Sequence, residues 1–409
     1  MKTAGIIAEY NPFHQGHRYH IEETRRLTGA DYIIVVMSGN FTQRGQAAIM
    51  DKYGRAKLAL ENGADLVLEL PVCFAVSSAS YFASGGVSLL DKLGVVDFLS
   101  FGSEGGSTEE LLSLSSFLLE EPENFKAHLQ TALKQGYTYP KARALALEKS
   151  FPEGKSELVS SPNNILALEY CTALLAFHSS IIPLPVKRLH SGYHDTGLSP
   201  TGYSSATAIR RVLIREIPAL LEEQLPSSVY KYLKKEYDKT LPLDINDFSP
   251  LLQYRLLMEQ PENLTLYADV HRELADRISG RIYSFTTYED FCDQLKTKEL
   301  THSRISRSLL HILLGLKEDA LQATKEEGYS RYAKILGFRK SAAPLLHAIK
   351  ANTSIPLIPK LADSAKSLDP VSRTMLEADI RAAHIYEGVL CSKFNRPFRN
   401  EYSRQFPIL

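Results

Sequence analysis

Two histidines near the amino terminus have a spacing that suits phosphate chemistry. His14 and His17 lie three residues apart, with Gly16 between them, where an apolar segment gives way to a helical pattern. A helix N-terminus has free backbone N–H groups and a dipole that favour anions. Two imidazoles placed there can donate hydrogen bonds to phosphate oxygens while charge builds up during attack at phosphorus. A pair of capping histidines in an Asn-Pro turn is the alternative, but the spacing and position favour the chemical role.

A second candidate phosphate-binding segment lies far downstream, at Ser205, Thr207 and Arg210. Ser205 suits the N-cap of a helix, and Thr207 falls in its first turn. One turn later, the planar guanidinium of Arg210 can reach a terminal phosphate. Alone, this segment would be better explained as an ordinary capped helix with a solvated arginine. Together with the histidines, it predicts a second group of ligands for the same phosphates.

Elements that could position these residues alternate along the first half of the chain. Apolar, β-branched segments predict strands at residues 4–10, 32–37, 66–70, 95–101 and 183–189, and periodic segments predict helices at 17–28, 51–62 and 77–93. Such alternation implies right-handed βαβ units and a parallel sheet, whose ligands bind beyond the carboxyl ends of the strands. We therefore expect an α/β fold. A Rossmann-like parallel-sheet domain would span residues 1–237, with a helical insertion around 107–177, and a mostly α-helical domain would span 238–409.

The composition excludes several classes of protein. Of 409 residues, 44% are hydrophobic and 23% are charged, and Lys+Arg and Asp+Glu both number 47, which excludes a disordered chain and a polycation. No apolar run is long enough to span a membrane. The cysteines are widely separated and form no C-x-x-C pair, so we expect neither a metal site nor a disulfide framework, and a cytoplasmic location. They are Cys73, Cys171, Cys292 and Cys391.

The two motifs together resemble those of the nucleotidylyltransferase superfamily: HxGH at residues 14–17 and S-x-T-x-x-R at 205–210. With the strings at 38–45 and 101–104 and the helical second half, the whole chain resembles the bacterial tRNA(Met) cytidine acetate ligase family. The resemblance implies that ATP activates acetate as acetyl-adenylate with release of pyrophosphate. The acetyl group then passes to N4 of the wobble cytidine of elongator tRNA(Met), giving N4-acetylcytidine and AMP. It implies Mg²⁺ carried with the ATP, and no coenzyme A.

The resemblance also assigns roles to residues. His14 and His17 would stabilise the α-phosphate, and Thr207 and Arg210 would hold the leaving pyrophosphate; Ala206 replaces the second serine of the superfamily motif, so one hydroxyl is missing. The residues expected to bind ATP are Ile7, Ala8, Glu9, Tyr10, Asn11, Pro12, Phe13, His14, Gln15, Gly16, His17, Arg18, Tyr19, His20, Gly102, Asn163, Arg188, Leu189 and Ser205. Without the resemblance, simpler explanations stay open: Gly102 could end a strand, Asn163 could cap a helix and Arg188 could be a surface cation.

The acceptor and the RNA need further groups. Asn40, Gln43 and Arg44 follow the second strand and could orient acetate, although a mobile polar loop is the competing interpretation. On the next helix, we expect Asp51, Lys52 and Arg55 to form a solvated face.

A basic patch in the second half could bind tRNA phosphates, and a plain solvated surface is the alternative. Its residues are Lys296, Lys298, Arg304, Arg307, Arg339 and Lys340. Arginines and aromatics also alternate near the C-terminus, which we attribute to ordinary packing. The sequence does not specify an oligomeric state.

Two rival functions remain. One is an adenylyltransferase that leaves AMP on a small phosphate-bearing metabolite and needs no tRNA. The other is a non-catalytic RNA-binding protein on a degenerate nucleotide fold. The intact histidine pair argues against the second rival, because binding alone does not need both imidazoles.

Overall fold

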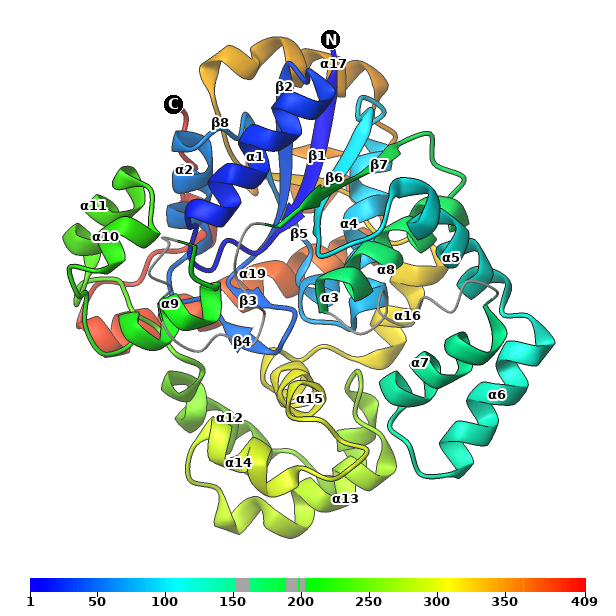
Figure 1. Cartoon of the computed structure of the whole chain (residues 1–409). Helices are drawn as coiled ribbons and strands as arrows, with labels where there is room; N and C mark the ends of the chain where they lie inside the picture. Colours follow the sequence, from blue (N-terminus) through cyan, green and yellow to red (C-terminus); the bar gives the residue numbers. More distant parts are fainter. Residues whose placement is uncertain (152–161, 189–197, 199–202, 363) are drawn as a thin grey trace.

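The computed structural model describes residues 1–151, 162–188, 198, 203–362 and 364–409. Its centre is a seven-stranded sheet with the strand order β7-β6-β1-β2-β5-β8-β9 (Figure 1). The strands β1 (Thr3–Ala8), β2 (Tyr32–Ser38), β5 (Leu66–Leu70), β6 (Phe98–Ser103) and β7 (Ile182–Lys187) run parallel. Each lies close to a strand predicted from the sequence. The predicted α/β class with a largely parallel sheet is confirmed.

Helices cover both faces of this sheet, and β2 shows why its β-branched run predicts a strand buried on two sides. Ile34 and Val36 pack into a core that includes α4 (Ala79–Lys92) and α8 (Pro162–Ala176). Their neighbours Ile33 and Val35 pack on the opposite face, into a core that includes α1 (Gln15–Thr28) and α2 (Lys52–Glu61). Alternate side chains of one strand therefore serve two cores, which explains the continuous apolar sequence. Figure 1 shows α1 and α2 on one side of the sheet and α4 and α8 on the other.

The remaining elements complete the chain. Smaller elements are α3 (Val72–Ala75) and the hairpin of β3 (Phe41–Thr42) and β4 (Gln46–Ala47). The insertion contains α5 (Thr108–Glu120), α6 (Glu123–Lys134) and α7 (Tyr139–Ser150). After β7 come α9 (Ala206–Leu213), α10 (Leu221–Gln224), α11 (Ser227–Glu236), α12 (Ser249–Met258), α13 (Arg272–Arg281), α14 (Tyr288–Leu295), α15 (His302–Leu314), α16 (Glu318–Glu326), α17 (Ala343–Asn352), α18 (Ser364–Ser367) and α19 (Pro370–Phe394). The 3₁₀ turns are η2 (Ile245–Phe248), η3 (Pro261–Leu266), η4 (Ile282–Ser284), η5 (Lys340–Ala342) and η6 (Glu401–Ser403).

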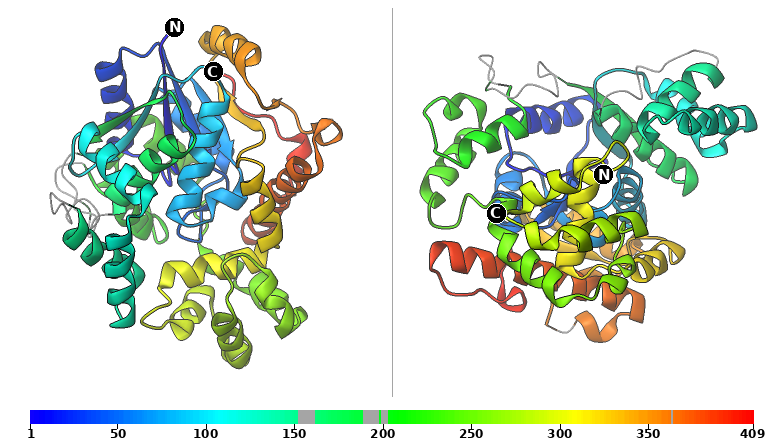
Figure 2. Two further views of the ribbon diagram at one scale, coloured as in Figure 1. Left: turned by 90° about the vertical axis from the view of Figure 1, so that its right-hand side faces the viewer. Right: turned by 90° about the horizontal axis from the view of Figure 1, so that it is seen from below.

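The second half of the chain is mostly helical, as predicted, but it also returns to the central sheet. β8 (Ala333–Phe338) pairs antiparallel with β5, and β9 (Leu357–Ile358) pairs with β8. The sequence analysis did not predict these strands. The helices α12–α15 pack into a core that also includes Phe41 and Ala47 of the β3–β4 hairpin and residues of α19. The left view in Figure 2 shows these helices, in yellow and green, at the lower end of the molecule. The proposed division at residue 237 stays a prediction, and the sheet contains strands from both sides of it.

Among the residues that the structure describes, no helix is both long enough and apolar enough to cross a bilayer.

Candidate active site

The two histidines form the N-terminal cap of α1. His14 is the N-cap residue, and its Nδ1 accepts a hydrogen bond from the Gly16 N–H (3.1 Å). The His14 N–H donates in turn to Nδ1 of His17 (3.3 Å), and the two rings stack with their centroids 3.7 Å apart. Because each Nδ1 accepts a hydrogen bond, each neutral ring carries its own proton on Nε2. The capping interpretation is therefore correct, and it leaves both Nε2–H groups available as donors.

The electrostatic surroundings keep these rings neutral. Burial lowers the pKa of His14 to about 3, and the positive charges of Arg188 and Arg210 add to the shift. Burial, followed by His14 and Arg188, lowers the pKa of His17 well below its ordinary value. Burial and Arg188 likewise lower the pKa of His20 to about 4. At neutral pH these side chains are hydrogen-bond donors without a formal charge.

The second motif meets the first directly. Ser205 caps α9 by accepting a hydrogen bond from the Ala208 N–H (3.1 Å). One turn on, Arg210 donates through Nη1 to the carbonyl oxygen of Asn11 (2.7 Å) and through Nη2 to Thr207 Oγ1 (3.2 Å). Asn11 belongs to the turn that leads into His14. The predicted convergence of two distant segments is thus present in the fold.

A third segment brings another arginine to the same place. Arg188, just after β7, donates through Nη1 to Asn163 Oδ1 (3.1 Å), and Asn163 Nδ2 donates to Glu104 (2.8 Å). The neighbouring Asn164 is buried, and its Oδ1 accepts from the Glu104 N–H (3.0 Å). Both asparagines at the start of α8 therefore hold the loop after β6, and Asn163 also orients Arg188. The sequence analysis missed Asn164, although the doubled asparagine after Pro162 is a visible signal.

The histidines, Asn163, Arg188 and the Ser-Thr-Arg turn line one cavity of about 420 Å³ at the carboxyl ends of β1, β6 and β7. The predicted residues in its wall are Ile7, Ala8, Glu9, Tyr10, Asn11, His14, Gly16, His17, Tyr19, His20, Gln43, Arg44, Gly102, Asn163, Arg188, Ser205, Thr207 and Arg210. One part of the wall is apolar, with Phe82, Phe101, Ile165, Leu166 and Tyr170. The sequence analysis did not assign these five to the site, because their spacing marks them only as core. A site with converging guanidiniums, neutral imidazole donors and an apolar wall suits a nucleotide.

Five predicted residues do not line the cavity. Phe13 is buried in the core, the Asn11–Pro12 peptide bond is cis, and Gln15 donates to the Leu225 carbonyl oxygen (3.1 Å). Arg18 is exposed and pairs with Glu22. The fifth is Asn40, whose Oδ1 accepts from the Lys52 N–H (2.8 Å) and so supports the loop from behind. Leu189 lies outside the described residues.

The candidate acceptor residues Gln43 and Arg44 are on the β3–β4 hairpin. The Gln43 N–H donates to Glu9 Oε1 (2.8 Å), which ties the hairpin to the end of β1. On the other side, Ser306 of α15 donates to the Gly45 carbonyl oxygen (2.8 Å). Gly45 has φ +73°, and a Cβ there would lie 2.5 Å from the backbone of α15, so only glycine fits. The hairpin is thus held between the nucleotide-binding segment and the helical second half.

Comparison with known proteins agrees with this geometry. A family model described as HIGH Nucleotidyl Transferase matches residues 1–401. The tRNA(Met) cytidine acetate ligase of Acetivibrio thermocellus is 40% identical over 406 residues, covering 98% of this chain and 97% of that protein. The chain belongs to the tRNA(Met) cytidine acetate ligase family. The family predicted from the motifs is therefore confirmed.

Solved structures in this family have the same fold over their whole length. The crystal structure of apo Thermotoga maritima TmcAL is 31% identical, with a TM-score of 0.94, and each chain covers 100% of the other. A second crystal structure of that protein, bound with alpha-thio ATP, is 30% identical with a TM-score of 0.91 and the same coverage.

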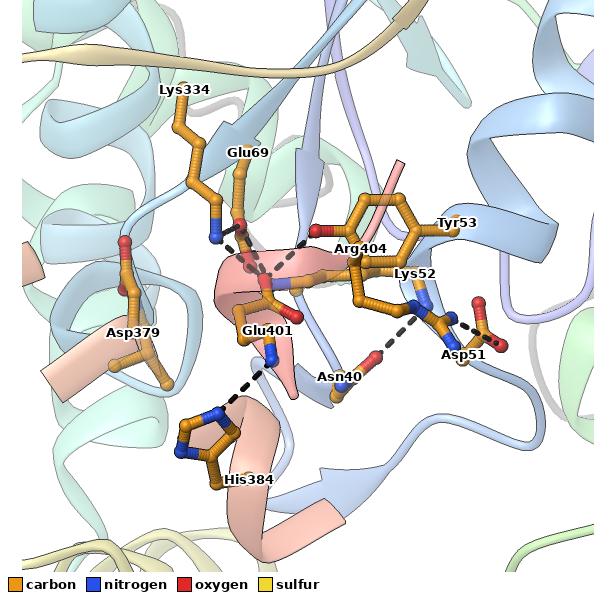
Figure 3. A network of polar contacts seen from close by, with 12 residues as sticks. Asn40, Asp51, Lys52, Tyr53, Glu69, Lys334, Asp379, His384, Glu401 and Arg404 are labelled. Carbon is orange, nitrogen blue, oxygen red and sulfur yellow. Dashed lines mark hydrogen bonds and ion pairs between the residues drawn. The ribbon is translucent and has the colours of Figure 1, made fainter. Parts of the chain in front are cut away.

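Behind the β3–β4 hairpin lies a buried network of charges (Figure 3). Lys52 Nζ donates to both oxygens of Glu69 (2.8 and 2.9 Å) and contacts Glu401 (2.6 Å). Lys334 Nζ contacts the same two carboxylates, Glu69 at 2.9 Å and Glu401 at 2.8 Å. These four side chains, at most 5% exposed, form a neutral quartet. A Cβ on Gly39 would lie 2.5 Å from Glu69 Oε1, so the quartet also touches the loop that leads into the hairpin.

The expected solvated face on α2 is therefore wrong, because Asp51, with its side chain 15% exposed, caps the helix and pairs with Arg404, and the other two residues are buried. Lys52 is 1% exposed, and Arg55 is fully buried. Arg55 donates through Nη1 to the carbonyl oxygens of Glu9 (2.6 Å) and Ser38 (3.1 Å), and through Nη2 to that of Gly39. It joins the end of β1, which lines the cavity, to the end of β2, which leads into the β3–β4 hairpin.

The predicted tRNA patch is divided between two places. Lys296 and Lys298 are exposed and precede α15 in the chain. Arg304, on α15, is half-buried below the β3–β4 hairpin. Arg307, on the same helix, lies 3.6 Å from Asp269. The structure does not bring Arg339 and Lys340 to this group: they follow β8, where Phe338 pairs with Leu66 at the start of β5, and Figure 1 shows this end of the sheet opposite α15.

No group of three or more His, Cys, Asp or Glu side chains is arranged to hold a metal ion within the ranges that the structure describes.

Proposed function

We propose that this protein activates acetate with MgATP as acetyl-adenylate and transfers the acetyl group to N4 of the wobble cytidine of elongator tRNA(Met). One observation carries the proposal: the histidine cap of α1 and the Ser-Thr-Arg turn of α9 meet through the hydrogen bond from Arg210 to Asn11, at the wall of one cavity. We place the protein in the cytoplasm, where its tRNA substrate resides.

In the first step, an acetate oxygen attacks the α-phosphorus and the bond to the pyrophosphate breaks. The Nε2–H groups of His14 and His17 donate to the oxygens on which negative charge grows, and being neutral they need no proton transfer. Arg210 and Thr207 hold the departing pyrophosphate. Mg²⁺ enters with the ATP phosphates, and acetate itself is the acetyl donor, without coenzyme A.

In the second step, the exocyclic amine of cytidine attacks the acetyl carbonyl carbon, and AMP leaves as the amine loses a proton. A free carboxylate is too poor an electrophile for this weak nucleophile, and adenylation converts one of its oxygens into a leaving group. We assign the orientation of acetate to Gln43 and Arg44, which lie in the wall beside Glu9. We assign RNA contacts to Lys296, Lys298 and Arg304, because α15 carries the acceptor hairpin.

His14→Asn separates the chemical role of this histidine from its capping role. Asparagine is among the best N-cap residues, so its Oδ1 replaces Nδ1 as the acceptor and the helix remains capped. The Nε2–H donor is lost, and acetate-dependent ATP–pyrophosphate exchange should fall roughly 10²- to 10³-fold, as for removal of one oxyanion donor. His347, exposed on α17, provides the matched control His347→Asn. Undiminished exchange in a folded His14→Asn protein would remove the chemical role.

Incubation of the protein with labelled acetate, ATP and total tRNA then identifies the acceptor of the acetyl group. Digestion to nucleosides should yield labelled N4-acetylcytidine from tRNA(Met). Adenylyl transfer to a small phosphate-bearing metabolite, with no label in RNA, would establish the rival enzyme, and RNA binding without pyrophosphate exchange would establish the non-catalytic one.

A further inference from the structure

A second hollow, distinct from the catalytic cavity, lies between α2, α11 and the C-terminal segment. Its volume is about 930 Å³, and we call it the α2–α11 groove. Tyr53 and Lys57 of α2, Lys231 and Tyr232 of α11, and Arg399 and Phe406 of the C-terminal segment line it. Figure 1 shows these three elements together on one side of the molecule.

The charges of this groove are unequal. Five cations face three carboxylates, and each carboxylate already has a partner: Asp51 pairs with Arg404, Glu61 with Lys57, and Glu236 accepts from Thr240. The remaining cations are Lys231, Lys235 and Arg399. All three are exposed, and they form no ion pair within the part of the chain that the structure describes. The groove therefore presents a positive surplus beside aromatic rings.

Hydrogen bonds connect the segment before α11 to residues around the catalytic cavity. Gln15, in the first turn of α1, donates to the Leu225 carbonyl oxygen just before α11. Ser204, in the cavity wall, donates through Oγ to Gln224 at the end of α10 (2.7 Å). The segment that leads into α11 is therefore tied to both chemical motifs, which places the groove on the same rigid frame as the reacting groups.

We propose that the α2–α11 groove binds the sugar–phosphate backbone of the RNA substrate. The proposal rests on the proposed function and adds a surface to it. Exposed, unpaired lysines and an arginine bind phosphates by releasing counterions, and this binding does not depend on base sequence. The rings of Tyr232 and Phe406 provide an apolar surface for ribose between the phosphates. A pocket for a base would instead need donors and acceptors held in fixed positions, whereas the side chains of these cations are exposed to solvent.

The test compares two pairs of lysines that lie on α11 or just after it. The groove variant is Lys231→Gln/Lys235→Gln, and the control is Lys234→Gln/Lys239→Gln, which removes the same charge at positions that do not line the groove. For the groove variant, we expect tRNA affinity at low salt to fall at least tenfold. The slope of log K against log salt should become shallower by about 1.5, since each phosphate contact contributes roughly 0.7–0.9. The control should keep the wild-type slope.

Acetate-dependent ATP–pyrophosphate exchange, measured without RNA, separates this proposal from the proposed function. Exchange should be unchanged in both variants. Equal losses of tRNA affinity in both variants, or an unchanged slope in the groove variant, would overturn the groove while leaving the function intact. Absence of exchange in the wild-type protein would instead overturn the function.

Discussion

Glu401 is the residue whose replacement tests the buried quartet most directly. Its Oε1 receives Lys52 Nζ at 2.6 Å, Lys334 Nζ at 2.8 Å and the Tyr53 hydroxyl at 2.9 Å (Figure 3). Burial alone would raise the pKa of Glu401, but the two lysines outweigh burial and hold it well below its usual value. Glu401→Gln therefore leaves two buried ammonium groups with Glu69 as their one carboxylate. We expect a loss of about 3–5 kcal/mol in the free energy of unfolding, the usual cost of an uncompensated buried charge.

The double variant Lys334→Met/Glu401→Gln tests whether the charge imbalance causes this loss. It restores neutrality, because Lys52 keeps both of its hydrogen bonds to Glu69. Replacing a whole buried pair is often close to neutral, so the second substitution should recover about 2 kcal/mol, as a coupling term of the double-mutant cycle.

Equilibrium unfolding in urea, followed by far-UV circular dichroism, measures all variants, and an unchanged m-value confirms that the transitions are comparable. The surface control is Glu22→Gln, which breaks an exposed pair with Arg18 and should cost at most about 0.5 kcal/mol. The direction of the pH dependence follows from the lowered pKa of Glu401. A carboxyl group whose pKa is lowered in the folded state stabilises the protein at pH values above its unfolded-state pKa, and this contribution is lost as the pH falls. The difference in unfolding free energy between wild type and Glu401→Gln should therefore shrink below pH 4.5. Two single variants that each cost no more than the surface control, or a double variant whose loss equals their sum, would refute the reasoning.

Two further predictions concern other groups around the site. Burial, followed by the charge of Glu69, raises the pKa of Asp379 from 3.8 to about 7; its contribution to stability is complete below 3.8 and is lost as pH rises through about 7. The wild-type melting temperature should therefore lose a contribution between about pH 4 and 7 that Asp379→Asn does not lose, and identical pH profiles of the two proteins would contradict the assignment. Asn163→Ala removes the hydrogen bond that orients Arg188, so the KM for ATP should rise roughly tenfold, equivalent to about 1.4 kcal/mol for a bond to a charged group, while kcat changes less. Initial rates of pyrophosphate exchange measure this effect, and equal changes in kcat and KM would argue against it.

The sequence predicted the parts of the fold that have local signals. The apolar run at residues 32–37 could be assigned to a strand because a strand buried on two faces has no polar side. β8 was missed because a six-residue segment that contains a lysine and a glycine, between helical segments, does not reveal a strand, and β9 has only two residues. Membership in a sheet then depends on pairing with β5, and nothing in the local pattern specifies that partner.

The candidate site divides in the same way. His14, His17, Ser205 and Arg210 could be identified because type and spacing imply a helix cap and a phosphate. Lys52 could not, since a lysine beside an aspartate on an amphipathic helix has the pattern of a solvated face. Its carboxylate partners lie on β5 and after α19, and no spacing along the chain relates these segments to α2. Long-range charge pairing of this kind needs the folded structure.

The histidine pair shows why capping and chemistry are not competing explanations for one motif. An imidazole has two nitrogens with opposite functions when it is neutral. In this structure, the backbone of α1 occupies Nδ1 of both rings and thereby fixes the proton on Nε2. A lysine at the same position would bring charge but no acceptor for the cap, and an asparagine would cap the helix, but its amide NH₂ does not reach the position of Nε2. Histidine alone among these residues satisfies the helix end and a growing oxyanion at once, so a structural role for His14 and His17 strengthens the inference of a chemical one.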